Sequence, residues 1–171
     1  TVIKSEIWEP YQLYKKFTGQ KKDKKLKPFI VAEKQKNQFA HKISTFIRGN
    51  FFIPDARKFW IKPSVAYLTK YLKNNPVDVI ITTGPPHSLH LIGLQLKSRL
   101  GIKWIADFRD PWIDIDYFHQ LPLTKKSIQK HQQLEKQVIS AADKVLVVGN
   151  TMRNSFLKYN KDVDIITNGY D

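Results

Sequence analysis

The chain has 171 residues, a hydrophobic fraction of 42% and a formal net charge of +14. This length suffices for one α/β domain with a buried core, and the absence of cysteine excludes disulfides and thiolate metal sites. No apolar run approaches the roughly 18 residues of a membrane span, and no signal peptide is evident, so we expect a cytoplasmic protein.

The first part of the chain, residues 1–76, is basic, aromatic and irregular. We expect short helices at residues 11–17, 39–47 and 63–72, the last with Ser64 as its N-cap. Nine lysines lie between residues 15 and 36. Such a run is compatible with a solvated segment, with an anionic membrane surface, or with nucleic acid. Because no zinc-finger spacing or aromatic RNA-binding signature accompanies the lysines, we do not expect a nucleic-acid partner.

The second part, residues 77–171, alternates strands with helices. The apolar run at residues 77–81 is short and β-branched, which is typical of a strand buried on both faces, and we expect it to end at Thr82. The other expected elements are a helix at 88–100 stopped by Gly101, a strand at 102–108, a helix at 124–142, a strand at 144–148, a short helix capped by Asn150, a strand at 163–167 and a turn at Asn168–Gly169. This order predicts an α/β fold with a Rossmann-like open parallel sheet and helices on both faces.

A charged loop follows the expected strand at residues 102–108. Because ligands of open parallel sheets bind at the carboxyl ends of the strands, Asp107, Arg109 and Asp110 are candidate site residues. Arg109 can hold a phosphate or carboxylate with two parallel hydrogen bonds, and a carboxylate can orient or deprotonate an acceptor hydroxyl. The alternative is that both aspartates merely pair with Arg109. Two aspartates around one arginine are no metal signature.

The turn from Gly84 to Ser88 precedes the amino terminus of a helix, where free N–H groups favour anions. A phosphate or a sugar hydroxyl would bind there, with His87 as the nearest titratable group. The alternative is a tight turn capped by Ser88. Trp112 either forms a wall on which a sugar stacks or closes the loop. His41, His119 and His131 have no partners at ligand spacing and are treated as background. His90 falls within the expected helix at 88–100, so we expect it to be structural or exposed.

Five segments, in this order and with ordinary spacing, resemble the amino-terminal domain of bacterial family-four glycosyltransferases of the GT-B fold. They are IPDARKFW (53–60), DVIITTGPPHSLHLIGLQLK (78–97), GIKWIADFRDPW (101–112), LEKQVISAADKVLVV (134–148) and IITNGYD (165–171). The resemblance implies a two-domain enzyme in which this chain is the acceptor side and the carboxyl-terminal donor-binding domain is absent. It also implies that the first strand with its glycine-rich loop is missing, so that the fragment alone is inactive.

The resemblance further implies a metal-independent enzyme without a cofactor, acting in polysaccharide biosynthesis on a saccharide or lipid-linked acceptor, with a nucleotide-sugar as donor. Many members place a His-Asp pair where this chain has Arg109 and Asp110, so the catalytic role is expected of Asp110. Asp55 and Trp60 would lie near the acceptor cleft, although packing is the alternative for Trp60. The lysine run would hold the protein peripherally at the inner face of the membrane.

The main rival is a non-catalytic basic module that binds nucleic acid or an anionic membrane. A different α/β enzyme is disfavoured, because no Walker loop, nucleophile elbow or dinucleotide fingerprint occurs.

Overall fold

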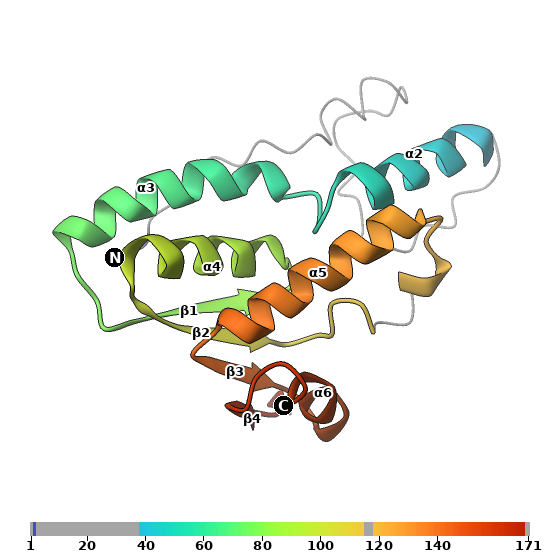
Figure 1. Ribbon diagram of the computed structural model, residues 1–171. Coiled ribbons are helices and arrows are strands. Elements are labelled where there is room, and N and C mark those ends of the chain that lie inside the picture. Colours follow the sequence, from blue (N-terminus) through green and yellow to red (C-terminus); the bar gives the residue numbers. More distant parts are fainter. Residues whose placement is uncertain (1, 3–37, 115–117, 170–171) are drawn as a thin grey trace.

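The computed structural model describes residue 2 and residues 38–114 and 118–169 (Figure 1). The elements in chain order are α2 (Gln38–Phe51), the 3-10 turn η1 (Lys58–Trp60), α3 (Ile61–Asn74), β1 (Val79–Gly84), α4 (Ser88–Leu100), β2 (Lys103–Phe108), the 3-10 turn η2 (Phe118–Gln120), α5 (Lys125–Ala141), β3 (Lys144–Val147), α6 (Asn150–Phe156) and β4 (Val163–Ile165). The helix expected at residues 11–17 and the lysine run lie outside the described residues.

The four strands form one parallel sheet in the order β1-β2-β3-β4. Val79 pairs with Lys103, Ile105 with Lys144, and Val145 with Val163. Each of the first three strands is followed by a helix that returns the chain to the starting edge, as parallel pairing requires. The predicted α/β class with a Rossmann-like parallel sheet is therefore confirmed.

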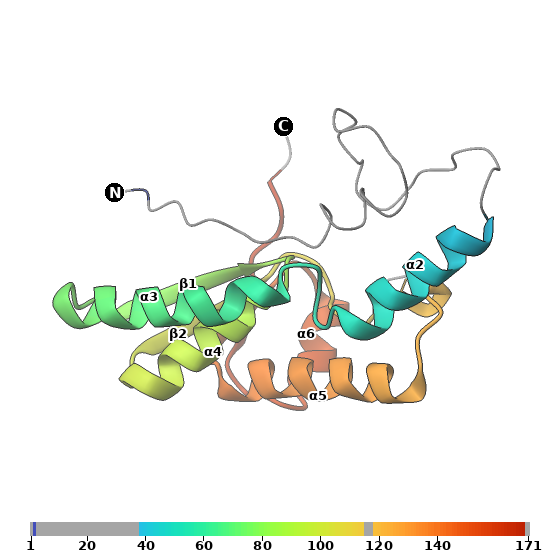
Figure 2. The same cartoon turned by 90° about the horizontal axis from the view of Figure 1, so that it is seen from above.

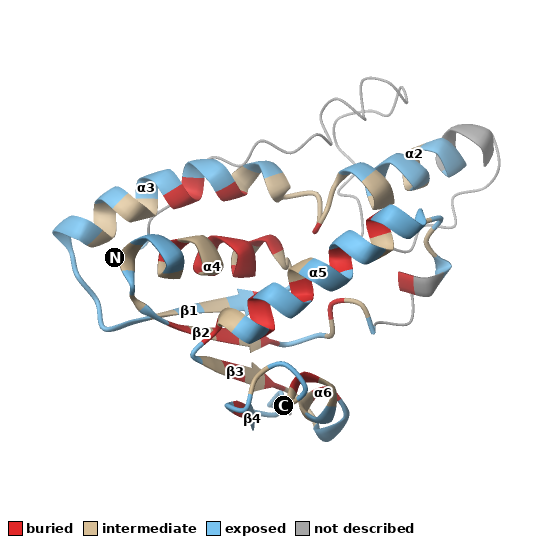
Figure 3. Ribbon diagram, in the orientation of Figure 1, coloured by how far each residue is buried: buried red, intermediate tan, exposed pale blue. Residues whose placement is uncertain are grey.

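The described helices that follow the strands pack on one face of the sheet. On that face Phe108 of β2 stacks on His90 of α4 at 4.3 Å between ring centroids and meets Phe156 of α6 edge-on at 5.0 Å. In Figure 2, α4 and α5 lie on the same side of β1 and β2, and Figure 3 shows buried and exposed residues alternating along α5. Trp104, Ala106 and Phe108 of β2 are buried beneath this layer.

No helix within residues 38–114 and 118–169 packs on the opposite face of the sheet. Val79 and Ile81 of β1 point there and are 41% and 60% exposed. The expectation that this strand is buried on both faces is therefore wrong for the described part of the chain. Its run of β-branched residues reflects strand propensity rather than burial on both sides.

Several element boundaries in the structure differ from the expected ones. β1 begins at Val79 and continues through Thr82, Thr83 and Gly84, because the threonines pair with β2 as readily as valine does. α3 begins at Ile61, so Ser64 is a buried residue of its first turn rather than the N-cap. Gly149, not Asn150, occupies the N-cap position of α6. The stop of α4 at Gly101, with φ of 67°, is confirmed.

A short chain of polar groups crosses the interface between α4 and the sheet. Trp104 Nε1–H donates to Thr82 Oγ1 at 2.8 Å, and Thr82 Oγ1 lies 2.9 Å from His90 Nδ1. Thr82 Oγ1 therefore accepts the indole N–H and shares one further hydrogen bond with His90 Nδ1, which links Trp104 of β2 to His90 of α4. Gly93 lets the helix approach this closely: a Cβ there would lie 2.4 Å from Trp104 Nε1.

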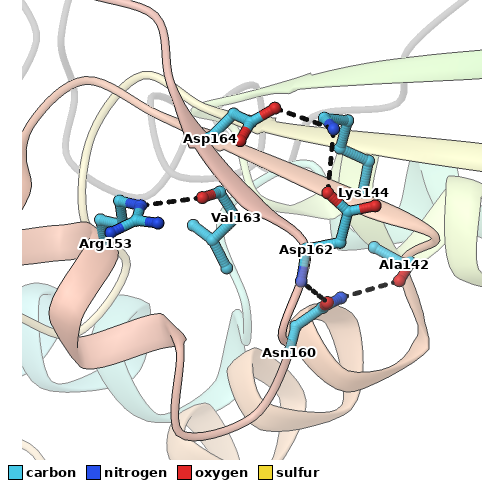
Figure 4. A network of polar contacts seen from close by, with 7 residues as sticks. All are labelled: Ala142, Lys144, Arg153, Asn160, Asp162, Val163 and Asp164. Atoms are coloured by element: carbon cyan, nitrogen blue, oxygen red, sulfur yellow. Dashed lines mark hydrogen bonds and ion pairs between the residues drawn. The ribbon is translucent and has the colours of Figure 1, made fainter.

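A second polar network fastens the amino ends of β3 and β4 (Figure 4). Asn160 Nδ2 donates to the carbonyl oxygens of Ile139 and Ala142, both at 2.8 Å, and so caps the end of α5. Lys144 bridges Asp162 and Asp164 at 2.9 and 2.8 Å. These contacts hold the sheet at the edge opposite the strands' carboxyl ends, and that carboxyl edge remains accessible.

Candidate functional site

The candidate site lies at the carboxyl edge of the sheet, where the loop after β2 contacts the end of β1 and the segment that follows β4. The main-chain N–H of Arg109 donates to the carbonyl of Gly84 at 3.0 Å, which joins the loop after β2 to the end of β1. Arg109 Nε–H donates to Asn168 Oδ1 at 2.8 Å, which joins the same loop to the segment after β4. Arg109 and Asn168 are both exposed. The local sequence predicts only a turn at Asn168, because its partner Arg109 is 59 positions away in the chain.

Asp110 lies beside Arg109 and is exposed. Asp107 is half-buried within β2, in register with Thr83 and Leu146, and points to the face opposite α4. Within the described ranges, neither carboxylate forms an ion pair with Arg109. The structural alternative, in which both aspartates merely pair with Arg109, is therefore not what the geometry shows, and Asp110 is the carboxylate at the edge itself.

The amino terminus of α4 is already occupied by a carboxylate of the chain. Ser88 N–H donates to Asp55 Oδ2 at 2.8 Å, while Asp55 Oδ1 accepts from the N–H of Arg57 at 2.8 Å. His87 takes the N-cap position without a side-chain hydrogen bond, and the Ser88 hydroxyl is fully buried. Asp55 thus stands where an anion would bind, and it reaches the helix from 33 residues upstream. The expected anchoring of the turn by a Ser88 cap is replaced by this long-range contact.

His87 and Trp112 pack against each other beneath the loop. Their rings stack at 4.7 Å with an interplanar angle of 4°, and Trp112 is 3% exposed. Burial lowers the pKa of His87 to about 4, so its ring is neutral near pH 7 and offers no positive charge to an anion. The placement of Trp112 corresponds to the loop-closing alternative rather than to a wall for sugar stacking. Trp60 likewise packs against the hydrophobic core.

Two residues of α5 that the sequence analysis passed over contact this loop. Trp112 Nε1–H donates to His131 Nδ1 at 3.0 Å, and the N–H of Ile113 donates to Glu135 Oε1 at 3.3 Å. His131 and Glu135 are 5% and 6% exposed. Burial raises the pKa of Glu135 to about 7, with the charge of Asp114 adding to the shift. The signal was present in the sequence as a histidine and a glutamate four residues apart on the buried stripe of a helix.

No group of three or more potential metal-ligating side chains is found among the residues that the structure describes. The described helices include none that is long and apolar enough to cross a membrane.

These features define a class of protein. A parallel α/β sheet of this topology is a Rossmann-like domain, and open sheets of this kind bind ligands at the carboxyl ends of their strands. The family model described as Glycosyltransferase Family 4 matches residues 23–171. Because this match covers most of the chain, the protein belongs to glycosyltransferase family 4, as the five sequence segments indicated. No curated protein matches the chain.

Proposed function

We propose that this chain is the acceptor-binding domain of a glycosyltransferase of polysaccharide biosynthesis. Such an enzyme moves a sugar from a nucleotide-sugar to a hydroxyl of a saccharide or of a lipid-linked glycan. The observation that carries the proposal is the exposed pair Arg109–Asp110 at the carboxyl edge of the sheet, in a chain that belongs to a glycosyltransferase family. The donor would bind to a second domain, so this polypeptide alone would not transfer sugar.

The two side chains of the pair have different tasks in this proposal. Asp110 orients the acceptor hydroxyl and removes its proton as the new bond forms. Arg109 is held at Nε by Asn168, which leaves its two Nη groups to grip a phosphate or carboxylate of the acceptor. Gly84 contributes its carbonyl to the Arg109 main chain and so fixes the distance between the two strand ends. The chemistry is metal-independent and needs no cofactor.

Binding of an acceptor analogue to the whole 171-residue chain tests this assignment. The probe is a saccharide linked through diphosphate to a short isoprenoid chain, titrated by calorimetry. We expect Arg109→Lys to weaken binding about tenfold, because lysine cannot form two parallel hydrogen bonds. Asp110→Asn leaves the contact of Arg109 with the acceptor's phosphate in place, so it should reduce the affinity less than Arg109→Lys does.

Matched control variants lie at the opposite edge of the sheet. Arg99→Lys at the end of α4 and Asp78→Asn before β1 make the same chemical changes at exposed positions. Both should bind like the unmodified chain. Equal losses in the controls and in the Arg109 and Asp110 variants would mean that the binding does not depend on this site, and the assignment would fail.

A peripheral membrane partner is also proposed, on the exposed face of α2. Ile43, Phe46 and Ile47 are 41–44% exposed and Phe51 is 62% exposed, at spacings that place them along one helix. Lys58 lies next to this face, 5.2 Å from the ring centroid of Phe52. An apolar stripe beside cationic groups is suited to an anionic lipid surface.

Sedimentation with vesicles tests the membrane proposal. The chain should sediment with vesicles that contain phosphatidylserine and remain in solution with purely zwitterionic ones. Ile47→Asp should reduce the bound fraction severalfold, whereas Ile166→Asp, an equally drastic change at an exposed position elsewhere, should not. Binding to RNA with a steep salt dependence, without vesicle binding, would instead support the nucleic-acid alternative.

A further inference from the structure

The loop that carries Arg109 and Asp110 is held from behind by two side chains of α5. His131 accepts the indole N–H of Trp112 at 3.0 Å, and one helical turn later Glu135 accepts the main-chain N–H of Ile113 at 3.3 Å. The main-chain N–H of Trp112 also favours the ionised form of Glu135 and acts to lower its pKa. These contacts begin two residues after Asp110, so the position of the site loop depends on α5.

We propose that Glu135 is a proton-linked positioning residue, whose carboxylate holds the main chain at Trp112 and Ile113 and whose protonation loosens the loop that carries Arg109 and Asp110. The consequence for sugar transfer rests on the proposed function. The coupling between Glu135 and the loop does not, because it follows from contacts within the chain.

The physical reason is the difference between an ionised and a neutral acceptor. A carboxylate accepts with both oxygens, and its hydrogen bonds are roughly twice as strong as those of a neutral acceptor. After protonation, one oxygen of Glu135 becomes an O–H donor and can no longer accept well from an N–H. With a pKa of about 7, Glu135 passes between these two states near neutral pH. Burial disfavours the ionised form of Glu135 in the folded chain as a whole, whereas the main-chain N–H groups of the loop favour it. Ionisation therefore lowers the free energy of unfolding and at the same time strengthens the attachment of the loop to α5.

Four charged or titratable groups lie near Glu135, and the two histidines among them titrate at lower pH than Glu135 does. Asp114, on the loop, raises the pKa of Glu135 by repulsion. His131 lies four residues earlier on α5, and burial lowers its pKa to about 4, so it stays neutral and keeps accepting from Trp112 throughout the range. His87, on the other side of Trp112, also has its pKa lowered to about 4 by burial. Lys136 is directed elsewhere, 5.4 Å from the ring centroid of Tyr159.

Nuclear magnetic resonance of the whole chain between pH 5.5 and 8.5 tests the proposal. We expect the amides of Ile113 and Trp112 to titrate with one midpoint near neutrality, and the amides of Arg109 and Asp110 to follow with the same midpoint. Protection of the Ile113 amide against exchange, corrected for the intrinsic rate, should fall about tenfold from pH 8 to pH 6, which corresponds to the loss of about 1.4 kcal/mol of hydrogen bonding. Glu135→Gln should abolish the shared titration and keep protection low at every pH.

Asp114→Asn provides a second variant in case Glu135→Gln does not fold. Removal of the neighbouring charge should move the shared midpoint to lower pH without abolishing it. Persistence of the titration in Glu135→Gln would overturn the proposal, as would a titration of Ile113 that Arg109 and Asp110 do not follow. An unchanged midpoint in Asp114→Asn would also overturn it. In the active enzyme the same midpoint should form the acid limb of the kcat/KM profile, and absence of transfer with the titration intact would count against the proposed function alone.

Discussion

His90 should make the stability of the chain fall steeply in acid. Its side chain is fully buried between α4 and the sheet, and burial lowers its pKa from 6.5 to about 3. Below pH 6.5 the unfolded chain binds a proton at this histidine, whereas the folded chain does not. Stability is therefore complete above pH 6.5 and is lost as the pH falls toward 3.

The magnitude follows from the shift. Over the 2.5 pH units between pH 6.5 and pH 4, His90 is protonated in the unfolded chain and neutral in the folded chain. Each of these pH units lowers the free energy of unfolding by about 1.4 kcal/mol. The free energy of unfolding should drop by about 3 kcal/mol from His90 alone, a large fraction of the ~5–15 kcal/mol of a typical domain. His87 and His131, whose pKa values are also lowered, add losses of the same sign.

Urea unfolding followed by tryptophan fluorescence at pH 7, 6, 5 and 4 measures this dependence. His90→Asn keeps a polar partner for the Thr82 hydroxyl but cannot titrate, so its stability should be lower at pH 7 and should fall less steeply with acid. Thr82→Val removes the hydrogen bond at 2.9 Å without removing the titrating group, so it should lower stability by a similar amount at every pH. An equal slope in His90→Asn and in the unmodified chain would contradict the lowered pKa of His90.

Three further changes test the packing and electrostatics of the same region. Gly93→Ala would bring a Cβ to 2.4 Å from Trp104 Nε1. It should lower the free energy of unfolding by ~1–3 kcal/mol, despite the better helix propensity of alanine. An unchanged free energy of unfolding would contradict the close approach of α4. Asp55→Ala removes the acceptor of the Ser88 N–H and should cost about 1–2 kcal/mol in the same assay, and a loss below ~0.3 kcal/mol would show that the helix end is satisfied otherwise. Glu135 has a raised pKa, so its contribution to stability is present below pH 4.5 and is lost as the pH rises through about 7. Glu135→Gln should therefore reduce the decline in the free energy of unfolding between pH 5 and pH 8 by up to ~3 kcal/mol. A decline as steep as in the unmodified chain would contradict the raised pKa of Glu135.

The sequence predicted the elements whose signals are local. The stripe of leucines from Ser88 to Leu100 and the stop at Gly101 defined α4 to the residue, because periodicity and a left-handed C-cap act within one turn. Thr82 and Thr83 were misassigned to a turn because the two prolines after Gly84 suggested an earlier break than the pairing with β2 allows.

The site itself was only half predictable, because its supporting contacts join distant parts of the chain. Arg109 and Asp110 follow from the position of a charged loop after a strand. Neither the capping of Ser88 by Asp55 nor the contact of Arg109 with Asn168 has a local signature, since the partners are 33 and 59 residues apart. Glu135 is a charged residue on an amphipathic helix, and its inward orientation depends on where the site loop passes over α5.

As an acceptor-binding domain, this chain should bind the acceptor rather than the nucleotide-sugar. A ¹⁵N–¹H titration of the chain with a diphosphate-linked saccharide, and separately with a panel of nucleotide-sugars, distinguishes the two. The acceptor analogue should shift the amides of Gly84, Arg109 and Asp110 saturably, and the nucleotide-sugars should not. Saturable binding of a nucleotide-sugar at those three amides, with no response to the saccharide, would contradict the account.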